Sequence, residues 1–332
     1  MGSDALEALD EMTAEELRAL VRALAPSFDA EQRALLQERL AARDREPDEA
    51  AVAPADLADT ARRTRSFRDL RAWCRALEEA GDWRGARAAA EEAAQLIAPH
   101  PIGPATFLDD AALAAQQLDA DDLDALLERA WRAGPTQVRL RRWLGAAADR
   151  DELRHRARAA LPAVPADEAP QRALLHLVLG QHPPAAALLA AVDPGTWGEP
   201  HHPGDLLFGA FAHLLGAGPL RLPRTVDKIP PSLRGGPVLR TPRVAAVLRR
   251  AALEPPPPAD RASISAAMRA AAERRLDAVT GYRLRGRYRH AAHLATTYAR
   301  VDPDDGAAWL ADIAARYRRF AALRRELESS GS

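Results

Sequence analysis

The same helix-turn-helix spacing occurs near each end of the chain, and it constrains the fold more than any other feature. The first copy turns at Gly81-Asp82-Trp83 and the second at Gly286-Arg287-Tyr288. After each turn, residues recur at helical spacing before a proline closes the unit: Ala86, Ala90, Ala93 and Pro99 in the first copy, and Ala291, Ala295, Tyr298 and Pro303 in the second. A single hairpin cannot bury its apolar face alone, so the repeat predicts an array of hairpins that cover one another.

The composition also favours helices. Aromatic residues make up only 5% of the 332 residues, and the runs of Val, Ile and Thr that strands prefer are missing. Ala, Leu, Arg and Glu dominate the sequence, and these residues favour helices. We therefore expect an all-α fold: a right-handed helical-hairpin array, or α-solenoid, with a Pro-rich irregular interruption.

Turn signals divide the chain into four parts. Residues 1–45 are expected to form an N-terminal helical hairpin, which an acidic, Pro-containing linker separates from a helical-repeat block at 57–192. Residues 193–259 are rich in Pro and Gly, and we expect them to be irregular apart from the apolar helix 205–215 and a short helix near 243–253. A C-terminal helical hairpin block follows at 260–328.

The two hairpin copies resemble the tetratricopeptide repeat (TPR) superfamily in a degenerate form. The resemblance is carried by Trp73, Cys74, Leu77, Ala86, Ala90 and Ala93 in one unit, and by Gly286, Tyr288, Ala291, Ala295 and Pro303 in the other. Ala90 and Ala295 replace the larger residue that is usual in the family. The resemblance implies a TPR-like array that binds a peptide or protein and has no intrinsic catalytic activity.

Charge is distributed unevenly although the net charge is only -1. Residues 1–130 contain 28 Asp and Glu against 15 Arg, whereas residues 131–332 contain 31 Arg and Lys against 19 acidic residues. Such a division would let the C-terminal half attract acidic partners or let copies associate head to tail. The alternative is that the charges only solvate exposed helix faces.

Cofactor, disulfide and membrane signals are missing from the sequence. The single Cys74 excludes an intramolecular disulfide and a multi-cysteine zinc site, and it is expected to be an inert core thiol. We find no secretory signal and no apolar run long enough to span a bilayer. We therefore expect a cytoplasmic protein that has no cofactor and no membrane partner, and the sequence leaves its oligomeric state open.

The irregular segment contains the first candidate site. Trp197, His201 and His202 precede the apolar helix, whose N-terminus we expect Asp205 to cap. Adjacent imidazoles can bind a metal ion or an anion, but no known ligand spacing accompanies them, so a loop-and-cap role is the favoured interpretation. His290 and His293 lie one helical turn apart, and no third metal ligand is indicated beside them.

The second candidate site is the C-terminal hairpin turn, where aromatic residues alternate with arginines. The arginines are Arg283, Arg285, Arg287 and Arg289. Arginine and aromatic side chains together can hold single-stranded nucleic acid through phosphates and stacked bases. The favoured interpretation is that Tyr282 and Tyr288 pack the hairpin while the arginines face solvent.

We conclude that the chain is a non-catalytic adaptor or scaffold of a bacterial cytoplasmic complex. It would bind a protein partner through Trp197, His201 and His202 and through the four arginines of the C-terminal turn. One alternative is a nucleic-acid-associated subunit of a ribonucleoprotein or DNA-acting complex that uses the basic C-terminal half. Another is an enzyme centred on His201 and His202.

Overall fold

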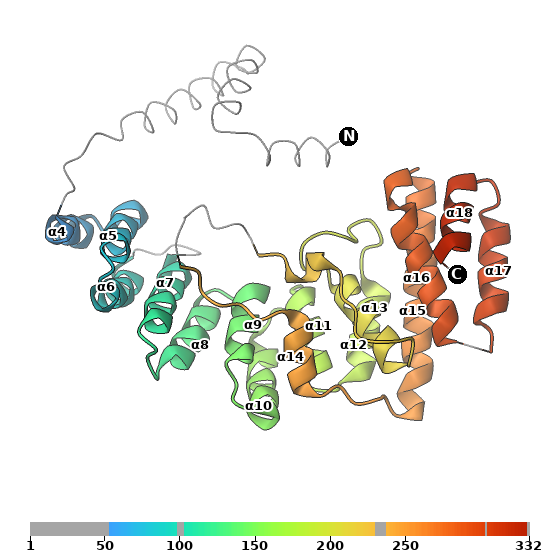
Figure 1. Cartoon of the computed structure of the whole chain (residues 1–332), viewed down its shortest axis with the longest axis horizontal. Helices are drawn as coiled ribbons and strands as arrows, with labels where there is room; N and C mark the ends of the chain where they lie inside the picture. The colour runs from blue at the N-terminus through green and yellow to red at the C-terminus, as the bar shows by residue number, and fades with distance from the viewer. Residues whose placement is uncertain (1–52, 98–102, 230–236, 303, 331–332) are drawn as a thin grey trace, which may run out of the picture. The chain divides into compact units, whose positions relative to one another are not determined.

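The computed structural model describes residues 53–97, 103–229, 237–302 and 304–330. The chain divides after Asp56, and Leu57–Ser332 forms one compact unit, to which the following description applies. The predicted hairpin at 1–45 and the closing prolines Pro99 and Pro303 lie outside the described residues. The described part contains fifteen α-helices, three short 3-10 helices and no strand, which confirms the all-α class (Figure 1). None of these helices is both long and apolar enough to cross a membrane.

The first helices follow one another with short connections, in the region predicted to be a repeat block. Their bounds are α4 (Pro54–Thr64), α5 (Phe67–Glu79), α6 (Trp83–Leu96), α7 (Gly103–Gln117), α8 (Leu123–Ala133), α9 (Gln137–Gly145), α10 (Arg150–Ala160), α11 (Ala169–Val178) and α12 (His182–Ala191).

The α5–α6 hairpin shows how local sequence sets the helix ends. The Ser66 side chain accepts a hydrogen bond from the backbone N–H of Asp69 at the start of α5, and the Asp82 side chain does the same for Gly85 at the start of α6. Gly81 adopts φ +72 between the helices, a conformation that glycine adopts without steric cost. The connection is therefore tight, and the two helices lie antiparallel as the spacing predicts.

From α5 to α12 each helix packs against the next helix in the chain, and α6 against α7 is the most extensive contact. Small side chains permit this close approach, because α6 buries Ala86, Ala89, Ala90 and Ala93. Contacts also link α5 with α7, α9 with α11, and α11 with α13 (Pro203–Leu214). Contacts between helices two positions apart in the chain therefore add to those between successive helices.

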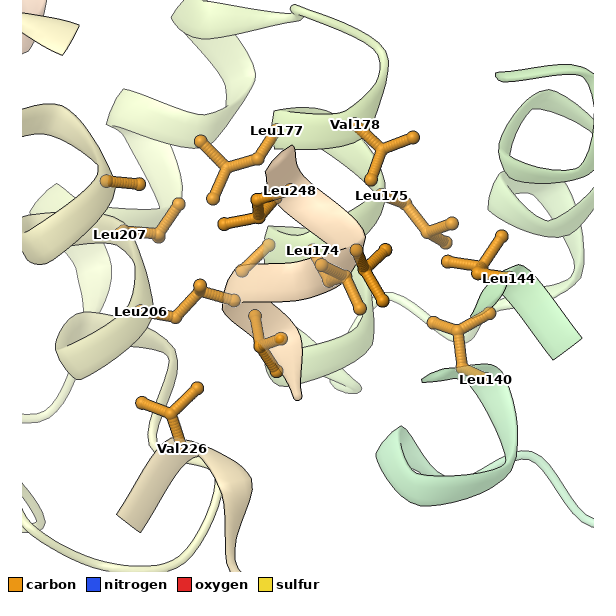
Figure 2. Close-up of a cluster of buried hydrophobic side chains, with 14 of the residues drawn as sticks. Leu140, Leu144, Leu174, Leu175, Leu177, Val178, Leu206, Leu207, Val226 and Leu248 are labelled. Atoms are coloured by element: carbon orange, nitrogen blue, oxygen red, sulfur yellow. The ribbon is translucent and has the colours of Figure 1, made fainter. Parts of the chain in front are cut away.

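The described residues of the interruption, 193–229 and 237–259, include the two helices expected from the sequence. They contain α13, the 3-10 helix η3 (Arg224–Asp227) and α14 (Val244–Ala251). Helix α14 lies between α13 and α15 in the sequence, yet it packs against α9, α10 and α11 (Figure 1). Its fully buried Leu248 lies among leucines that include Leu174 and Leu177 of α11 (Figure 2). The interruption therefore folds back onto the repeat block and becomes part of its core.

An extended segment, residues 238–242, leads into α14 and is held against the ends of α7 and α9. The amide of Gln116 brackets its backbone, since Nε2 donates to the Val238 carbonyl at 3.2 Å and Oε1 accepts from the Arg240 N–H at 2.8 Å. Arg142 Nε donates to Thr241 Oγ1 at 2.8 Å. A Cβ on Gly145 would lie 2.3 Å from Cγ of Pro242, so glycine makes this approach possible.

The C-terminal block contains α15 (Pro258–Gly281), the 3-10 helix η4 (Arg285–Arg287), α16 (Tyr288–Val301), α17 (Gly306–Arg316) and α18 (Ala321–Ser330). Trp309 of α17 is buried and packs edge-on against Tyr298 with ring centroids 4.8 Å apart. Its indole N–H donates to Glu273 of α15 at 2.7 Å. Aromatic side chains with satisfied polar atoms therefore connect α17 to both α15 and α16.

Candidate functional site

The two candidate sites of the sequence meet at Trp197. Its ring centroid lies 5.1 Å from that of His202 and 5.4 Å from that of His290, and the side chain is only 1% exposed. Arg287 Nη1 donates to the Trp197 carbonyl at 3.3 Å. The loop before α13 and the start of α16 therefore form one assembly, although they are far apart in sequence.

The adjacent histidines of this loop have different environments. His201 has φ +61, and its Nδ1 lies 3.1 Å from the carbonyl oxygen of Val226. His202 is buried against the Trp197 ring. Burial lowers the pKa of both imidazoles, which favours the uncharged ring. Neither the Trp197 nor the His202 side chain is exposed on the surface where a protein partner could bind it.

A metal-binding role for His201 and His202 would require further ligands beside them. Among the described residues, no group of three or more His, Cys, Asp or Glu side chains is arranged to hold a metal ion. Adjacent residues of a chain rarely direct their side chains at one ion, and His201 and His202 have separate contacts.

Asp205 does not cap α13, contrary to the sequence prediction. The helix begins at Pro203, with His202 at its N-cap position and no side-chain cap. Asp205 Oδ2 instead accepts hydrogen bonds from the backbone N–H of Gly198 and from Thr225 Oγ1, both at 3.2 Å. Since α13 starts two residues before Asp205, the carboxylate lies beside the preceding loop and can hold that loop in place.

The other oxygen of Asp205 faces α16. Its Oδ1 lies 3.3 Å from His290 Nε2, and the Asp205 side chain is 1% exposed. A buried carboxylate needs a partner of this kind because an isolated charge is costly away from water. No sequence signal identified this pair, because its members lie on different helices and match no motif.

A pocket of about 290 Å³ opens beside this pair. It lies between α13, α16 and the loop after α13. The lining residues are Trp197, Asp205, Phe208, Gly209, Ala212, His213, Ala217, Pro219, Arg221, Pro223, His290, His293, Leu294, Thr297 and Arg300. His201 and His202 are not among them.

The second candidate site is the turn between α15 and α16. Tyr288 packs the hairpin as predicted, being buried with its ring centroid 6.4 Å from that of Phe320. The same prediction is wrong for Tyr282, which is 77% exposed. Leu284 is 40% exposed, and the four predicted arginines, Arg283, Arg285, Arg287 and Arg289, are all exposed. We call the group formed by Tyr282, Arg283, Leu284, Arg285 and Arg289 the Tyr282 patch.

Comparisons with protein-family models, with curated proteins and with solved structures found no match to this chain.

Proposed function

We propose that the chain is a non-catalytic scaffold or adaptor of a bacterial cytoplasmic complex, in which a TPR-like helical array holds a protein partner. The observation that carries the proposal is the Tyr282 patch. Tyr282 and Leu284 are two of the four large hydrophobic side chains exposed in the described part of the chain, and arginines flank both. Tyrosine and arginine are enriched among the residues that dominate binding energy in protein interfaces.

The packing of the array supports this choice of surface. The segment 238–242 and helix α14 already cover parts of α7, α9, α10 and α11. A partner would therefore meet this chain's own residues on that side of the helices, whereas the Tyr282 patch is open to solvent.

The positive charge of the Tyr282 patch favours an acidic partner. The patch carries Arg283, Arg285 and Arg289, and the C-terminal half of the chain is basic overall. An acidic protein surface that accepts an aromatic side chain would complement both features. Arg287 has a different role, because it bonds to the Trp197 carbonyl and so fixes the turn to the loop before α13.

Nucleic acid is the second candidate ligand of the same patch. The 77% exposure of Tyr282 favours this alternative, because an exposed ring between arginines can stack on an unpaired base. The third hypothesis, an enzyme centred on His201 and His202, gains no support from the geometry, since neither residue lines the pocket.

Affinity purification of the full-length protein from its host, with and without nuclease, tests the proposal. We expect a protein partner that survives nuclease and that is reduced at least tenfold by the pair Arg283→Glu and Arg285→Glu, and likewise by Tyr282→Ala. The pair Arg318→Glu and Arg319→Glu changes the net charge equally at exposed positions of the same block and should retain the partner. Partners lost on nuclease treatment would favour nucleic acid, and equal effects of both charge pairs would refute a role for the patch.

A further inference from the structure

We propose that the pocket between α13 and α16 binds a compact organic carboxylate, in which the anionic group is joined to an apolar or aromatic body. This proposal is independent of the Tyr282 patch. The pocket volume of about 290 Å³ lies near the lower end of the range for small-molecule sites, so the ligand must be small.

Apolar side chains form the inner wall. Trp197, Phe208 and Leu294 are nearly completely buried, and each contributes to the lining. The Trp197 ring also packs edge-on against Phe208, with centroids 6.2 Å apart. Two fixed aromatic rings and an aliphatic side chain suit the apolar body of a ligand and offer it little polar contact.

Hydrogen-bond donors are grouped around the same pocket. Arg221 comes from the loop after α13, and Arg300 comes from α16. Arg300 is positioned by its own helix, because Nη2 donates to Thr297 Oγ1 at 3.1 Å and Nε lies 3.4 Å from the Thr296 carbonyl. A guanidinium held in this way can present its remaining N–H groups to a carboxylate as charge-assisted donors.

A glycine keeps the Arg221 loop close to the pocket. A Cβ on Gly209 of α13 would lie 2.7 Å from the backbone carbonyl oxygen of Arg221. The absence of a side chain at Gly209 therefore lets this loop lie directly on α13. The two arginines of the pocket lining therefore come from separate elements of the chain.

The one carboxylate of the pocket lining is buried and makes its contacts within the chain. Asp205 is the acidic residue among the described lining residues, and its side chain is 1% exposed. Its Oδ2 accepts hydrogen bonds from the Gly198 N–H and from Thr225 Oγ1, and its Oδ1 lies 3.3 Å from His290 Nε2. The accessible polar groups are those of Arg221 and Arg300 together with His213 and His293, which are donors or potential donors.

Calorimetric titration of the full-length protein with three probes tests the proposal. The probes are 3-phenylpropionate, the neutral analogue 3-phenylpropan-1-ol, and inorganic phosphate. We expect 3-phenylpropionate to bind and the other two to bind at least tenfold more weakly, because each lacks either the charge or the apolar body. Equal binding of the alcohol, binding of phosphate alone, or no binding of 3-phenylpropionate would overturn the proposal.

Variants then locate the binding site. Arg300→Gln and Arg221→Gln should each weaken binding of 3-phenylpropionate about tenfold, the scale of a lost charge-assisted hydrogen bond. Ala212→Leu should block the pocket without changing any charge, whereas Arg318→Gln, at an exposed position that does not line the pocket, should bind as the unmodified chain does. Retained affinity in both Arg300→Gln and Ala212→Leu would place the bound probe elsewhere and refute the assignment.

Discussion

His290 on α16 lies 3.3 Å from Asp205 on α13, Nε2 to Oδ1, and the carboxylate of this pair is almost fully buried. The same carboxylate accepts hydrogen bonds from Gly198 and Thr225. One side chain therefore ties together the loop before α13, the 3-10 helix η3 and the C-terminal helical block.

Replacing this carboxylate should be costly. We expect Asp205→Ala to lower the free energy of unfolding by about 3 kcal/mol, because it removes a buried carboxylate and leaves the partly buried donors of Gly198 and Thr225 without their acceptor. Urea denaturation measures the change, with Asp312→Ala at an exposed position of α17 as the control. A loss no larger than that of the control would show that the Asp205 contacts contribute little.

The close approach of Gly145 to Pro242 predicts a local effect. Gly145→Ala would put a Cβ 2.3 Å from Pro242 Cγ, so we expect residues 238–242 to shift at a cost of about 1–3 kcal/mol. Hydrogen exchange should report this as faster exchange of the Arg240 amide, whose bond to Gln116 would weaken. Gly281→Ala meets no atom within 4 Å and should leave Arg240 protection unchanged. Unaltered exchange in Gly145→Ala would mean that the segment adapts without loss of its contacts.

The Cys74 thiol should be unreactive in the folded chain. Burial raises its pKa to about 12, so the reactive thiolate is scarce at pH 8, and the side chain is 1% exposed. A thiol-reactive chromogenic disulfide should label it only after unfolding in denaturant. Rapid stoichiometric labelling of the native protein would contradict this environment.

The same pKa shift has a consequence at high pH. Above pH 9.0, the ordinary value for the thiol, the unfolded chain loses the Cys74 proton while the folded chain keeps it. The Cys74 contribution to stability therefore decreases as the pH rises from 9 towards 12. Cys74→Ala, compared with the unmodified chain by urea denaturation at pH 8 and pH 10.5, should show a smaller fall in stability over this interval.

His202 should make the stability of the folded chain depend on pH in the acidic range. Burial beside Trp197 lowers its pKa below the ordinary value of 6.5, so the unfolded chain binds a proton that the folded chain resists. Stability should fall as the pH decreases through 6.5, and His202→Gln should reduce that fall between pH 7.5 and pH 5.5. His176 and His201 are shifted in the same direction, so part of the pH dependence should remain in the variant. An identical pH profile for His202→Gln would exclude His202 as a contributor.

Much of the local structure could be predicted from the residues themselves. Helix ends follow from short-range chemistry, such as the turn at Gly81 and the cap at Asp82, and both act within a few residues. The burial of Trp73, Ala90 and Tyr298 follows from helical spacing in the same way. The four arginines of the C-terminal turn were predicted to face solvent, and all four are exposed.

Long-range contacts were not predictable by the same reasoning. Nothing in the spacing of Gln116 indicates that it brackets Val238 and Arg240, because that contact depends on where the interruption returns to the repeat block. The exposure of Tyr282 was likewise mispredicted, since Tyr288 alone occupies the packing position at the start of α16.

The sequence by itself determined the helical class, the turn at Gly81 and the packing positions of the two hairpin copies, because these depend on periodicity and on hydrogen bonds between near neighbours. Only the tertiary structure decided that Trp197 packs between His202 and His290, that Asp205 pairs with His290, and that a pocket opens beside them. These contacts join segments that share no motif. They form only when the chain folds so that the loop before α13 and helix α13 lie against α16.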